Sequence, residues 1–469
     1  SWSFRKAEKF FDVVTYTGNG TAGRTIAHSL GSTPGMMIVK QTSGAYNWQI
    51  YHSGFGPTKF LEFNIGATQT SSAVWNDTAP TDSVFTVGNE YGVNRSGYTY
   101  VAYLFASDAG GYGDDGTENI IKCGGVTSSS GGLIDVTGLG FEPQWVLIKN
   151  SSASGGWTMF DIMRGMSNTG NTGTTAQGLF PNTSAFESAA VCWPNADGFF
   201  VNGSYISGSN NSADFIYIAI RRPMKTPEAG TEVFNAITRT GTGANATITG
   251  LGFNPDEIIS QTRGLTYGGI WFSRLRGGNQ ALYPPSTAAE YTSTNCVTEF
   301  STNGYKLGTD GSNQINSNTV TYVNWCFKRA AGFMDVVCWT GEPPNTNQRV
   351  SHNLTVAPEL IIYKGRTKGN YWRVYSGNIN QYIALNINNP IVTGSNFWGT
   401  SAPTATDFGF NPGAMDLDGF TAVAYLFATV AGVSKVGSYT GTGSNVDVDC
   451  GFTASARFIF IKRTDSTGD

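Results

Sequence analysis

Four tryptophans each follow a turn rich in Gly, Ser or Asn, and their side chains are the best candidates for binding a ligand. They are Trp48, Trp157, Trp271 and Trp372. An exposed indole can stack on a sugar ring while neighbouring polar groups hold the hydroxyls. A tryptophan that recurs at one place can equally anchor a core or a hairpin. The sequence leaves both interpretations open.

Further candidates follow these tryptophans within three to seven residues. They are Tyr51, Asp161, Arg164, Arg276 and Tyr375. Asp161 and Arg164 carry charges that could hold a sugar, although a local salt bridge that pins a loop would explain the same pair. A second group of tryptophans, Trp75, Trp193 and Trp398, lies in segments of variable length, where binding residues are often found. The ligand expected at these positions is a carbohydrate.

The histidines argue against a catalytic base. His28 and His352 occupy one position of an internal repeat, where two other repeats have Thr137 and Thr249. Threonine cannot replace histidine as a general base. His28 and His352 are therefore predicted to be structural or surface residues. His52 has no counterpart elsewhere in the chain.

Paired carboxylates, which would suggest glycoside hydrolysis, are not indicated. Asp12 and Asp335 correspond to each other, but the repeats between them have Asn119 and Asn235 at this position. A catalytic carboxylate would not alternate with an amide. The sequence therefore predicts a protein that is not an enzyme.

No metal or cofactor site is predicted. The densest acidic cluster, Asp114, Asp115 and Glu118, could hold calcium, but its spacing is not that of an EF-hand and a solvated linker explains it better. The six cysteines include no Cys-x-x-Cys pair and no histidine at metal-ligand spacing, so free and mostly buried thiols are expected. No nucleophile elbow or phosphate-binding glycine loop is present either.

The composition excludes two kinds of partner. The net charge is −4, and the scattered Lys and Arg residues form no basic stripe that could neutralise a phosphate backbone. No apolar run approaches the ~18 residues that span a bilayer. We therefore expect neither nucleic-acid binding nor membrane insertion. With 40% hydrophobic but only 13% charged residues, the chain can build cores and presents mainly uncharged polar faces.

The elements that position these residues form a repeat of about 100 residues with three landmarks in constant order. The first is a Thr-Gly turn, whose glycines recur at intervals of 100 residues between Gly241 and Gly441. The second is a turn before a short apolar strand, and its prolines are Pro34, Pro143, Pro255 and Pro358. The third is an apolar closing strand at 100–105, 215–222, 322–327 and 422–427. Such apolar runs are typical of a central strand that is buried on both faces.

The landmarks divide the chain into four whole repeats and two partial ones. The whole repeats are 10–109, 110–229, 230–331 and 332–431, with 1–9 as the end of a preceding repeat and 432–469 as the start of a truncated fifth. Residues 2–6 match the closing strand at 325–329. We therefore expect a segment of a longer chain, with unstable ends because a partial repeat cannot bury its own apolar face.

The predicted fold is all-β. Each repeat contains roughly seven to nine short strands joined by Gly- and Asn-rich turns, which favours a tandem array of antiparallel β-sandwich-like modules. A β-propeller is the alternative, and it would need two blades of about forty to fifty residues in each repeat.

One string of residues resembles a known group. Residues 3–18, SFRKAEKFFDVVTYTG, resemble the tandem repeats of large virion and tail-fibre proteins of marine tailed phages, which often stand beside concanavalin-A-like lectin modules. In that group the tryptophan strand commonly reads Trp-x-x-Tyr-Asp-x-x-Arg-Gly. The second repeat keeps this pattern from Trp157 to Gly165 with Phe160 in place of tyrosine, and the other three keep it only in part. The resemblance covers nearly the whole chain.

The resemblance implies an extracellular place on a virion. The leading hypothesis is a structural appendage protein, a tail fibre or capsid-decorating fibre, that acts as a modular spacer and in host attachment. Its partners would be other virion proteins and host-surface glycans. A homo-oligomer such as a trimer fits this hypothesis, but no heptad pattern indicates a number. The alternatives are a lectin-like carbohydrate-binding array, a polysaccharide depolymerase and a bacterial repeat adhesin.

Overall fold

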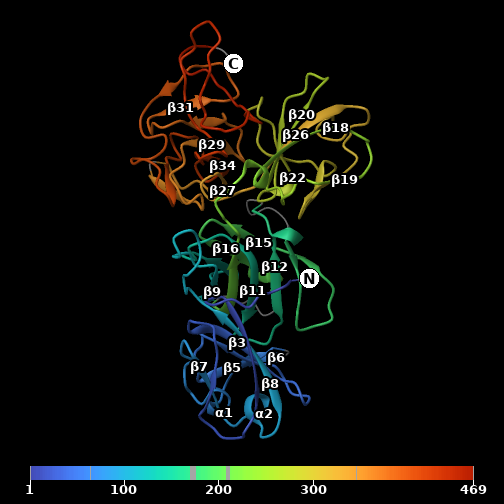
Figure 1. The fold of residues 1–469 in the computed structure, drawn as a ribbon, viewed down its shortest axis with the longest axis vertical. Helices are drawn as coiled ribbons and strands as arrows, with labels where there is room; N and C mark the ends of the chain where they lie inside the picture. The colour runs from blue at the N-terminus through green and yellow to red at the C-terminus, as the bar shows by residue number, and fades with distance from the viewer. Residues whose placement is uncertain (1, 64, 169–175, 207–211, 345, 468–469) are drawn as a thin grey trace. The chain divides into compact units, whose positions relative to one another are not determined.

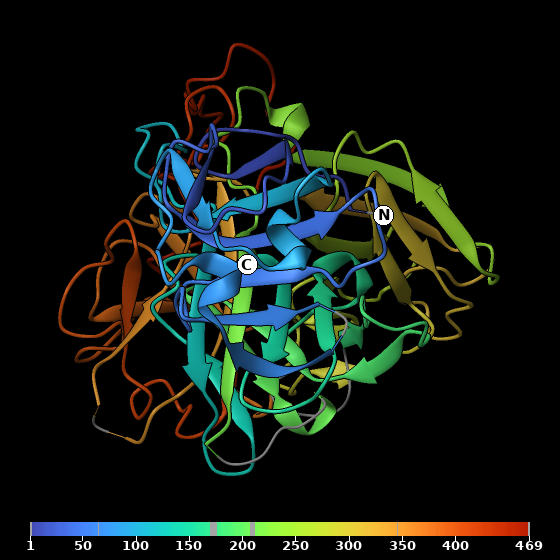
Figure 2. The ribbon, with the colours of Figure 1, turned by 90° about the horizontal axis from the view of Figure 1, so that it is seen from below.

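The computed structural model describes residues 2–63, 65–168, 176–206, 212–344 and 346–467. The chain divides into two compact units, one of residues 1–166 and 173–222 and one of residues 167–172 and 223–469 (Figure 1). Both consist of antiparallel sheets, none of which closes into a barrel. The predicted all-β class of sandwich-like repeats is confirmed. Much of the chain between the short strands is irregular (Figure 2).

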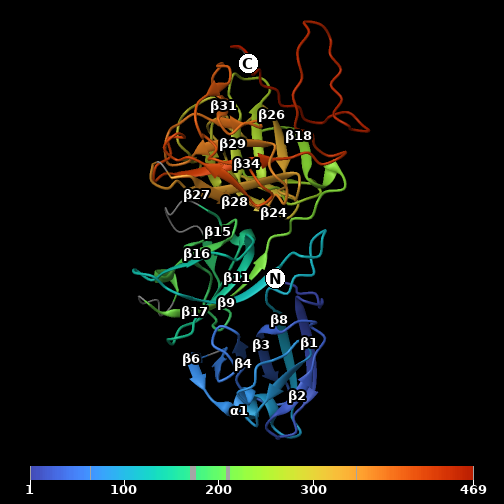
Figure 3. The same ribbon diagram turned by 90° about the vertical axis from the view of Figure 1, so that its left-hand side faces the viewer.

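In the first repeat one large sheet lies over a small one. The order of the large sheet is β1 (Phe11–Thr17), β8 (Thr99–Ala106), β3 (Pro34–Gln41), β4 (Gln49–His52), β5 (Lys59–Glu62) and β6 (Ile65–Thr70). Figure 3 shows β1, β8, β3 and β4 beside one another. The small sheet pairs β2 (Arg24–Ala27) with β7 (Val84–Val87), next to the single turns α1 (Ser72–Trp75) and α2 (Tyr91–Asn94).

The second repeat has the same plan with a shorter large sheet. Its order is β12 (Trp157–Asp161), β11 (Pro143–Asn150), β17 (Asp214–Arg221) and β9 (Ile121–Thr127). The small sheet contains β10 (Leu133–Val136), β16 (Gly198–Asn202) and β15 (Cys192–Asn195). A separate hairpin pairs β13 (Ala176–Gly178) with β14 (Ser188–Ala190).

The third and fourth repeats return to the order of the first. The third has β18 (Phe234–Thr240), β26 (Thr321–Phe327), β20 (Glu257–Thr262), β21 (Ile270–Ser273), β22 (Gly277–Leu282) and β23 (Tyr291–Thr292), over β19 (Ala246–Thr249), β25 (Gly304–Leu307) and β24 (Val297–Ser301). The fourth has β27 (Met334–Thr340), β34 (Thr421–Phe427), β29 (Leu360–Gly365), β30 (Arg373–Tyr375), β31 (Gln381–Ala384) and β32 (Val392–Thr393), over β28 (Gln348–Ser351) and β33 (Asp407–Phe410). Each sheet takes its strands from a single predicted repeat.

The closing strand is an interior strand in every large sheet. β8, β17, β26 and β34 each lie between the first strand of the repeat and the strand after the proline landmark. One face of the sheet packs on the small sheet of its own repeat, as Val146 and Phe215 pack with Phe199. The other face packs on the large sheet of a partner repeat, as Trp271 packs with Tyr425. Apolar residues on both faces explain why these strands have no polar alternation.

Repeats one and two, and repeats three and four, therefore share cores in pairs. In the first unit Met36 and Leu104 belong to the same apolar cluster as Trp145 and Ile218. Each large sheet buries apolar side chains on both faces. Removing the partner repeat would therefore expose one of these two faces to water. The pair of repeats is the structural unit of each half.

The two partial repeats differ from their whole counterparts. Residues 2–6 and 432–467 form no strand, although the sequence pattern matches strands there. Apolar side chains in the second of these segments are exposed, with Ile459 at 69% and Ile461 at 58%.

Candidate functional site

The four tryptophans that head a strand divide into one exposed ring and three buried rings. Trp48 is 37% exposed, whereas Trp157, Trp271 and Trp372 are 1%, 7% and 0% exposed. A ring without an accessible face cannot stack on a sugar, so the interpretation of these three as ligand-presenting residues is corrected to a core role. The physical reason is that their strands lie within the large sheets, on the face that meets the partner repeat.

Equivalent tryptophans meet directly in the second pair of repeats and through a phenylalanine in the first. The Trp271 and Trp372 rings contact edge to face with centroids 5.3 Å apart, and Tyr425 lies 4.7 Å from Trp271. In the first unit Phe63 joins the two, stacking on Trp157 at 5.1 Å and lying 6.4 Å from Trp48. The recurrence of tryptophan at this position is therefore explained by pairing of repeats.

Tyr51 and Tyr375 are also core residues rather than ligand contacts. Each is 5% exposed. Each packs edge to face on a tryptophan of its own repeat, Tyr51 on Trp75 at 6.1 Å and Tyr375 on Trp398 at 5.6 Å. These two tryptophans, candidates of the second group, are thereby placed in the core under the large sheet, whereas Trp193 stacks on Phe200 at 4.1 Å.

Asp161 and Arg164 form the local salt bridge that the sequence left open. Arg164 Nε lies 2.6 Å from Asp161 Oδ2, and Asp161 caps the short η1 (Ile162–Arg164) by accepting two backbone N–H groups at 3.0 Å. Arg164 also donates to Glu187 Oε1 at 2.6 Å. The pair has one aromatic contact, because Trp2 Nε1 donates to Asp161 Oδ2 at 3.2 Å. In this structure these residues bind an indole of the same chain.

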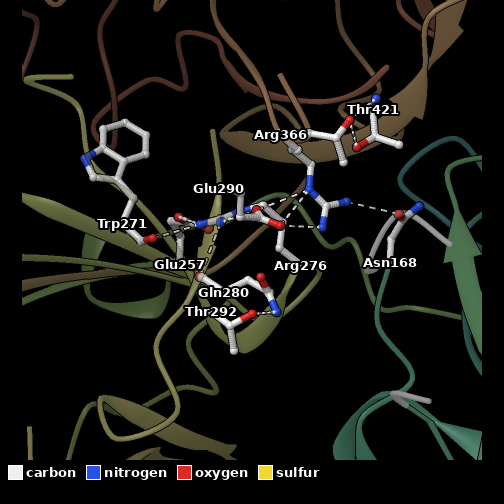
Figure 4. A network of polar contacts seen from close by, with 10 residues as sticks. Asn168, Glu257, Trp271, Arg276, Gln280, Glu290, Thr292, Arg366 and Thr421 are labelled. Atoms are coloured by element: carbon white, nitrogen blue, oxygen red, sulfur yellow. Dashed lines mark hydrogen bonds and ion pairs between the residues drawn. The ribbon is translucent and has the colours of Figure 1, made fainter. Parts of the chain in front are cut away.

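Arg276 lies in a buried ionic network between the third and fourth repeats (Figure 4). Its guanidinium is 0% exposed and lies 2.7 Å from Glu290 Oε2. Arg366 of the fourth repeat reaches the other oxygen, Glu290 Oε1, at 2.8 Å, and donates to Asn168 at 3.2 Å. A surface ligand cannot reach this arginine. The interpretation of Arg276 as a sugar contact is corrected to that of an inter-repeat ion pair.

Glu257 is the fourth ionisable member of this network, and no sequence argument singled it out. Its side chain is fully buried, 3.7 Å from Arg276 Nη2, and both carboxylate oxygens lack a hydrogen bond among the described residues. Burial raises the pKa of Glu257 to about 8, and the attraction of Arg276 offsets this only in part. A raised pKa of Glu257 is expected because Arg276 makes its shorter contact with Glu290 and not with Glu257.

The histidines have structural roles. His28 Nδ1 accepts the Leu30 N–H at 3.3 Å and His352 Nδ1 accepts the Leu354 N–H at 3.2 Å, so the two positions make the same turn. His52 is fully buried, with Nε2 3.1 Å from the Tyr217 carbonyl and Nδ1 accepting the Gly54 N–H at 3.0 Å. Burial lowers the pKa of His52 to about 4.

Asp12 and Asp335 hold equivalent joints between repeats. Asp12 lies 2.6 Å from Lys6 Nζ and accepts the Ser29 N–H, while Asp335 lies 2.8 Å from Arg329 and accepts the Asn353 N–H. Burial alone would raise the pKa of Asp12, but Lys6 and two backbone N–H groups hold it below its usual value. The two aspartates occupy equivalent sequence positions because both bind a basic side chain and a backbone N–H group at a joint.

A capped turn recurs in all four repeats, and sequence reasoning missed it. Lys149 and Lys364, at the end of the strand after the proline landmark, are 1% and 0% exposed. Their ammonium groups donate to backbone carbonyls, of Ala153 at 3.1 Å and of Asn370 at 3.0 Å. Lys40 and Gln261 make the same contact in the other repeats, with the carbonyls of Tyr46 and Tyr267. Burial lowers the pKa of both Lys149 and Lys364 to about 8.

The cysteines and the acidic loop show no reactive or metal-binding arrangement. All six cysteines are free and five are buried. Burial raises the pKa of Cys296 and Cys326 to about 12, which keeps them as thiols. In the acidic loop Glu118 pairs with Arg221 at 2.7 Å. The described part of the chain contains no group of three or more His, Cys, Asp or Glu residues that could hold a metal ion.

Trp48 is the tryptophan of the original four that retains an accessible ring. Of its neighbours in the chain, Asn47 and Gln49 both donate to Glu62, at 3.1 Å and 3.0 Å. The Lys40 ammonium lies 5.7 Å from the centroid of the Trp48 ring. An exposed indole with an ammonium near its ring is chemically suited to a sugar, since stacking and a hydroxyl contact are both available.

The fold and these contacts define an all-β protein of paired repeats in which most notable aromatic and charged residues serve packing. The chain belongs to the family described as a domain of unknown function, DUF7483, which it matches over residues 5–220 and 229–469. Each matched segment covers one pair of repeats, in agreement with the shared cores. No curated protein matches the chain. Within the described residues no helix is long and apolar enough to cross a membrane.

Proposed function

We propose that this chain is a structural protein of a phage virion appendage, a modular spacer built from paired repeats that acts outside the cell together with other virion proteins. The observation that carries the proposal is that recurring aromatic and charged residues make contacts between repeats. Trp271, Trp372, Arg276 and Arg366 all join one repeat to the next. Such contacts between repeats are expected of a protein whose function is to hold modules together.

The structural contacts of the candidate catalytic residues support the same proposal. The histidines, the buried cysteines and the equivalent Asp12 and Asp335 are engaged in structural contacts. The resemblance of residues 3–18 to tail-fibre repeats supplies the virion context.

Two measurements test this function. Antibody against the chain should label an appendage of purified phage particles in electron micrographs, and absence of the protein from intact particles would contradict the proposal. Stretching single molecules should give two unfolding events, each releasing roughly 70–90 nm of chain, because the extended length is at most ~3.6 Å per residue. Four smaller steps would show that single repeats, and not pairs, resist force.

Carbohydrate binding at Trp48 is a second candidate function. The observation that favours it is the exposed ring of Trp48, whose centroid lies 5.7 Å from the Lys40 ammonium. On a glycan array the full chain should bind a narrow class of sugars, and Trp48→Ala should abolish the signal. Phe420→Ala, which removes a similarly exposed ring from the fourth repeat (38%), is the matched control and should leave binding intact. Equal loss in both variants would rule out a site at Trp48.

A further inference from the structure

Arg373, in β30 of the fourth repeat, is a buried arginine without a carboxylate partner. It is 8% exposed and forms no ion pair with any residue that the structure describes. The other buried arginines of the described chain each lie within 3.5 Å of a carboxylate oxygen; they are Arg222, Arg274, Arg276, Arg329 and Arg366. A guanidinium keeps its charge when it is buried, and a buried charge is costly unless an opposite charge compensates it.

The hydrogen bonds of Arg373 do not replace the missing carboxylate. Nη1 reaches the Ala414 carbonyl at 3.5 Å and the Met415 sulfur at 3.7 Å, and both distances are long for a hydrogen bond. Nε is buried and has no acceptor among the described residues. Nη2 donates to none of them either, and unlike Nε it is not enclosed by the chain. The guanidinium therefore has donors to spare and one of them can be reached from outside.

The charge at this position is peculiar to the fourth repeat. Arg373 pairs with the residue before Lys364 of the capped turn, and the same pairing in the other repeats gives Gln49, Thr158 and Ile270. In the first repeat Gln49 donates to Glu62 on the next strand at 3.0 Å. In the fourth repeat the residue across from Arg373 on the next strand is Ala384. The fourth repeat thus has a charge where the others have none, and no acid on the strand beside it.

Two half-buried aromatic rings lie next to the guanidinium. Arg373 lies 5.0 Å from the centroid of the Tyr382 ring in β31, and Phe397 packs edge to face on Tyr382 at 4.9 Å. The Phe397 carbonyl accepts the Asn411 N–H at 3.2 Å, and Asn411 Oδ1 accepts the Ala414 N–H at 3.2 Å. The rings and the turn beside Arg373 are therefore held in place by the backbone. We call Arg373, Tyr382 and Phe397 the Arg373 site.

The Arg373 site is formed by the fourth repeat alone. Arg373 lies on the same face of β30 as Tyr375, two residues later, and Tyr375 packs on Trp398 under the large sheet of its own repeat. The third repeat covers the opposite face of β30, where Val374 belongs to the same apolar cluster as Trp271. Pairing of repeats therefore brings no carboxylate to Arg373.

We propose that Arg373 binds the oxyanion group of a small ligand, a carboxylate or a phosphate, and that the body of the ligand lies against Tyr382 and Phe397. An oxyanion that accepts from Nη2 supplies the negative charge that the described chain does not, and guanidinium groups recognise carboxylate and phosphate by such charged hydrogen bonds. Aromatic rings beside this charge suit a ring-shaped ligand, and an acidic sugar combines a ring with a carboxylate. The Arg373 site is separate from Trp48, and the proposal does not rest on the proposed function.

The test is isothermal titration calorimetry of the full chain with glucuronate, glucose and inorganic phosphate at constant ionic strength. We expect saturable binding of glucuronate with a dissociation constant on the order of millimolar, and none of glucose, which has the ring without the charge. Binding of phosphate but not of glucuronate would show that the rings contribute nothing and would overturn the acidic-sugar part. No binding of either anion at tens of millimolar would overturn the whole proposal.

A pair of variants assigns the binding to Arg373. Arg373→Gln, which introduces the residue of the first repeat, should weaken glucuronate binding by about tenfold or more. Arg349→Gln removes an exposed arginine of the same repeat, which pairs with Asp407, and should leave binding unchanged. Binding that survives in Arg373→Gln, or that falls equally in both variants, would place the anion elsewhere and contradict the proposal.

A second measurement needs no ligand. In urea unfolding without added anion, Arg373→Gln should keep or raise the midpoint, because it removes a buried charge that lacks a partner. Arg366→Gln breaks the buried pair with Glu290 and should lower the midpoint clearly. An equal loss of stability in the two variants would show that the chain itself compensates Arg373, and the site would be excluded.

Discussion

Trp271 and Trp372 occupy the same position in consecutive repeats, and their rings meet edge to face with centroids 5.3 Å apart. Tyr425 completes the cluster, 4.7 Å from Trp271 and 6.5 Å from Trp372. A residue that recurs in sequence is thus in contact with its own equivalent in space. This contact ties the stability of one repeat to that of the next.

Replacing Trp372 by alanine should destabilise both repeats of the second unit. The ring is 0% exposed, and loss of a buried tryptophan typically costs about 3–5 kcal/mol because it leaves a cavity. Hydrogen exchange should show faster exchange in β20, β21 and β26 of the third repeat as well as in the mutated fourth repeat. Trp48→Ala is the control, and its effect should be about 1 kcal/mol or less because the ring is partly exposed. Loss of protection in the fourth repeat alone would argue against coupled pairs.

His52 should make the first unit sensitive to acid. Its neutral form is fixed by two contacts, since Nε2–H donates to Tyr217 and Nδ1 accepts from Gly54. Its pKa is about 4 in the folded chain against an ordinary value of 6.5, so the unfolded chain binds the proton first. The stability contribution is complete above pH 6.5 and is lost as the pH falls toward 4, by about 3 kcal/mol in total.

The variant His52→Gln tests this linkage because an amide cannot take up the proton. Peptides of the first unit should exchange faster in the wild type at pH 4.5 than expected from their exchange at pH 7, and the variant should show a smaller difference. His28 and His352, whose pKa values burial also lowers, remain in both proteins and form a common background. An unchanged acid response in the variant would assign the effect to other groups.

Glu257 should give the second unit the opposite response. Its pKa is raised to about 8 from an ordinary 4.5, so the folded chain keeps a proton that the unfolded chain has released. The resulting stability is complete below pH 4.5 and is lost as the pH rises toward 8. Glu257→Gln removes the titrating group while keeping its size. We expect the variant to be more stable than the wild type at pH 8 and above, measured by urea unfolding of the second unit. A less stable variant would show that Glu257 is ionised and needed by Arg276.

The sequence was sufficient for the class of fold and the order of elements, because the landmarks depend on local chemistry. Prolines precede a strand, Thr-Gly forms a turn, and an apolar run forms the central strand. The pairing of repeats could not be predicted from the sequence, for a physical reason. Periodicity indicates that a face is apolar, but not whether a small sheet or another repeat covers it. Trp48 and Trp157 share one sequence position, yet one ring is exposed and the other buried.

One feature of the sequence does indicate the buried ionic network. Glu257 stands opposite Phe327, in the same place where Met36, Trp145 and Leu360 stand opposite an apolar residue of the closing strand. A single acid in a row of apolar residues predicts a buried partner of opposite charge. Which arginine supplies it depends on the pairing of repeats, and so only the structure identifies Arg276 and Arg366.

The capped turn provides its own control, because the third repeat has Gln261 where the fourth has Lys364. Both side chains donate to the carbonyl of the residue six positions later. Lys364→Met should destabilise the fourth repeat by about 1–3 kcal/mol, since carbonyl groups would be left without a donor. Lys364→Gln should keep the donor and therefore fold with a stability close to that of the wild type.

The pH dependence of this pair of variants separates the hydrogen bond from the charge. The pKa of Lys364 is lowered to about 8 from 10.5 by burial, so below pH 8 the folded chain must keep a buried charge. Between pH 8 and 10.5 the unfolded chain holds the proton more tightly, and the wild type gains stability relative to Lys364→Gln as the pH rises. Urea unfolding at pH 7 and pH 10 measures this difference. A constant difference between the two proteins would mean that the ammonium is solvated and that its role is only that of a donor.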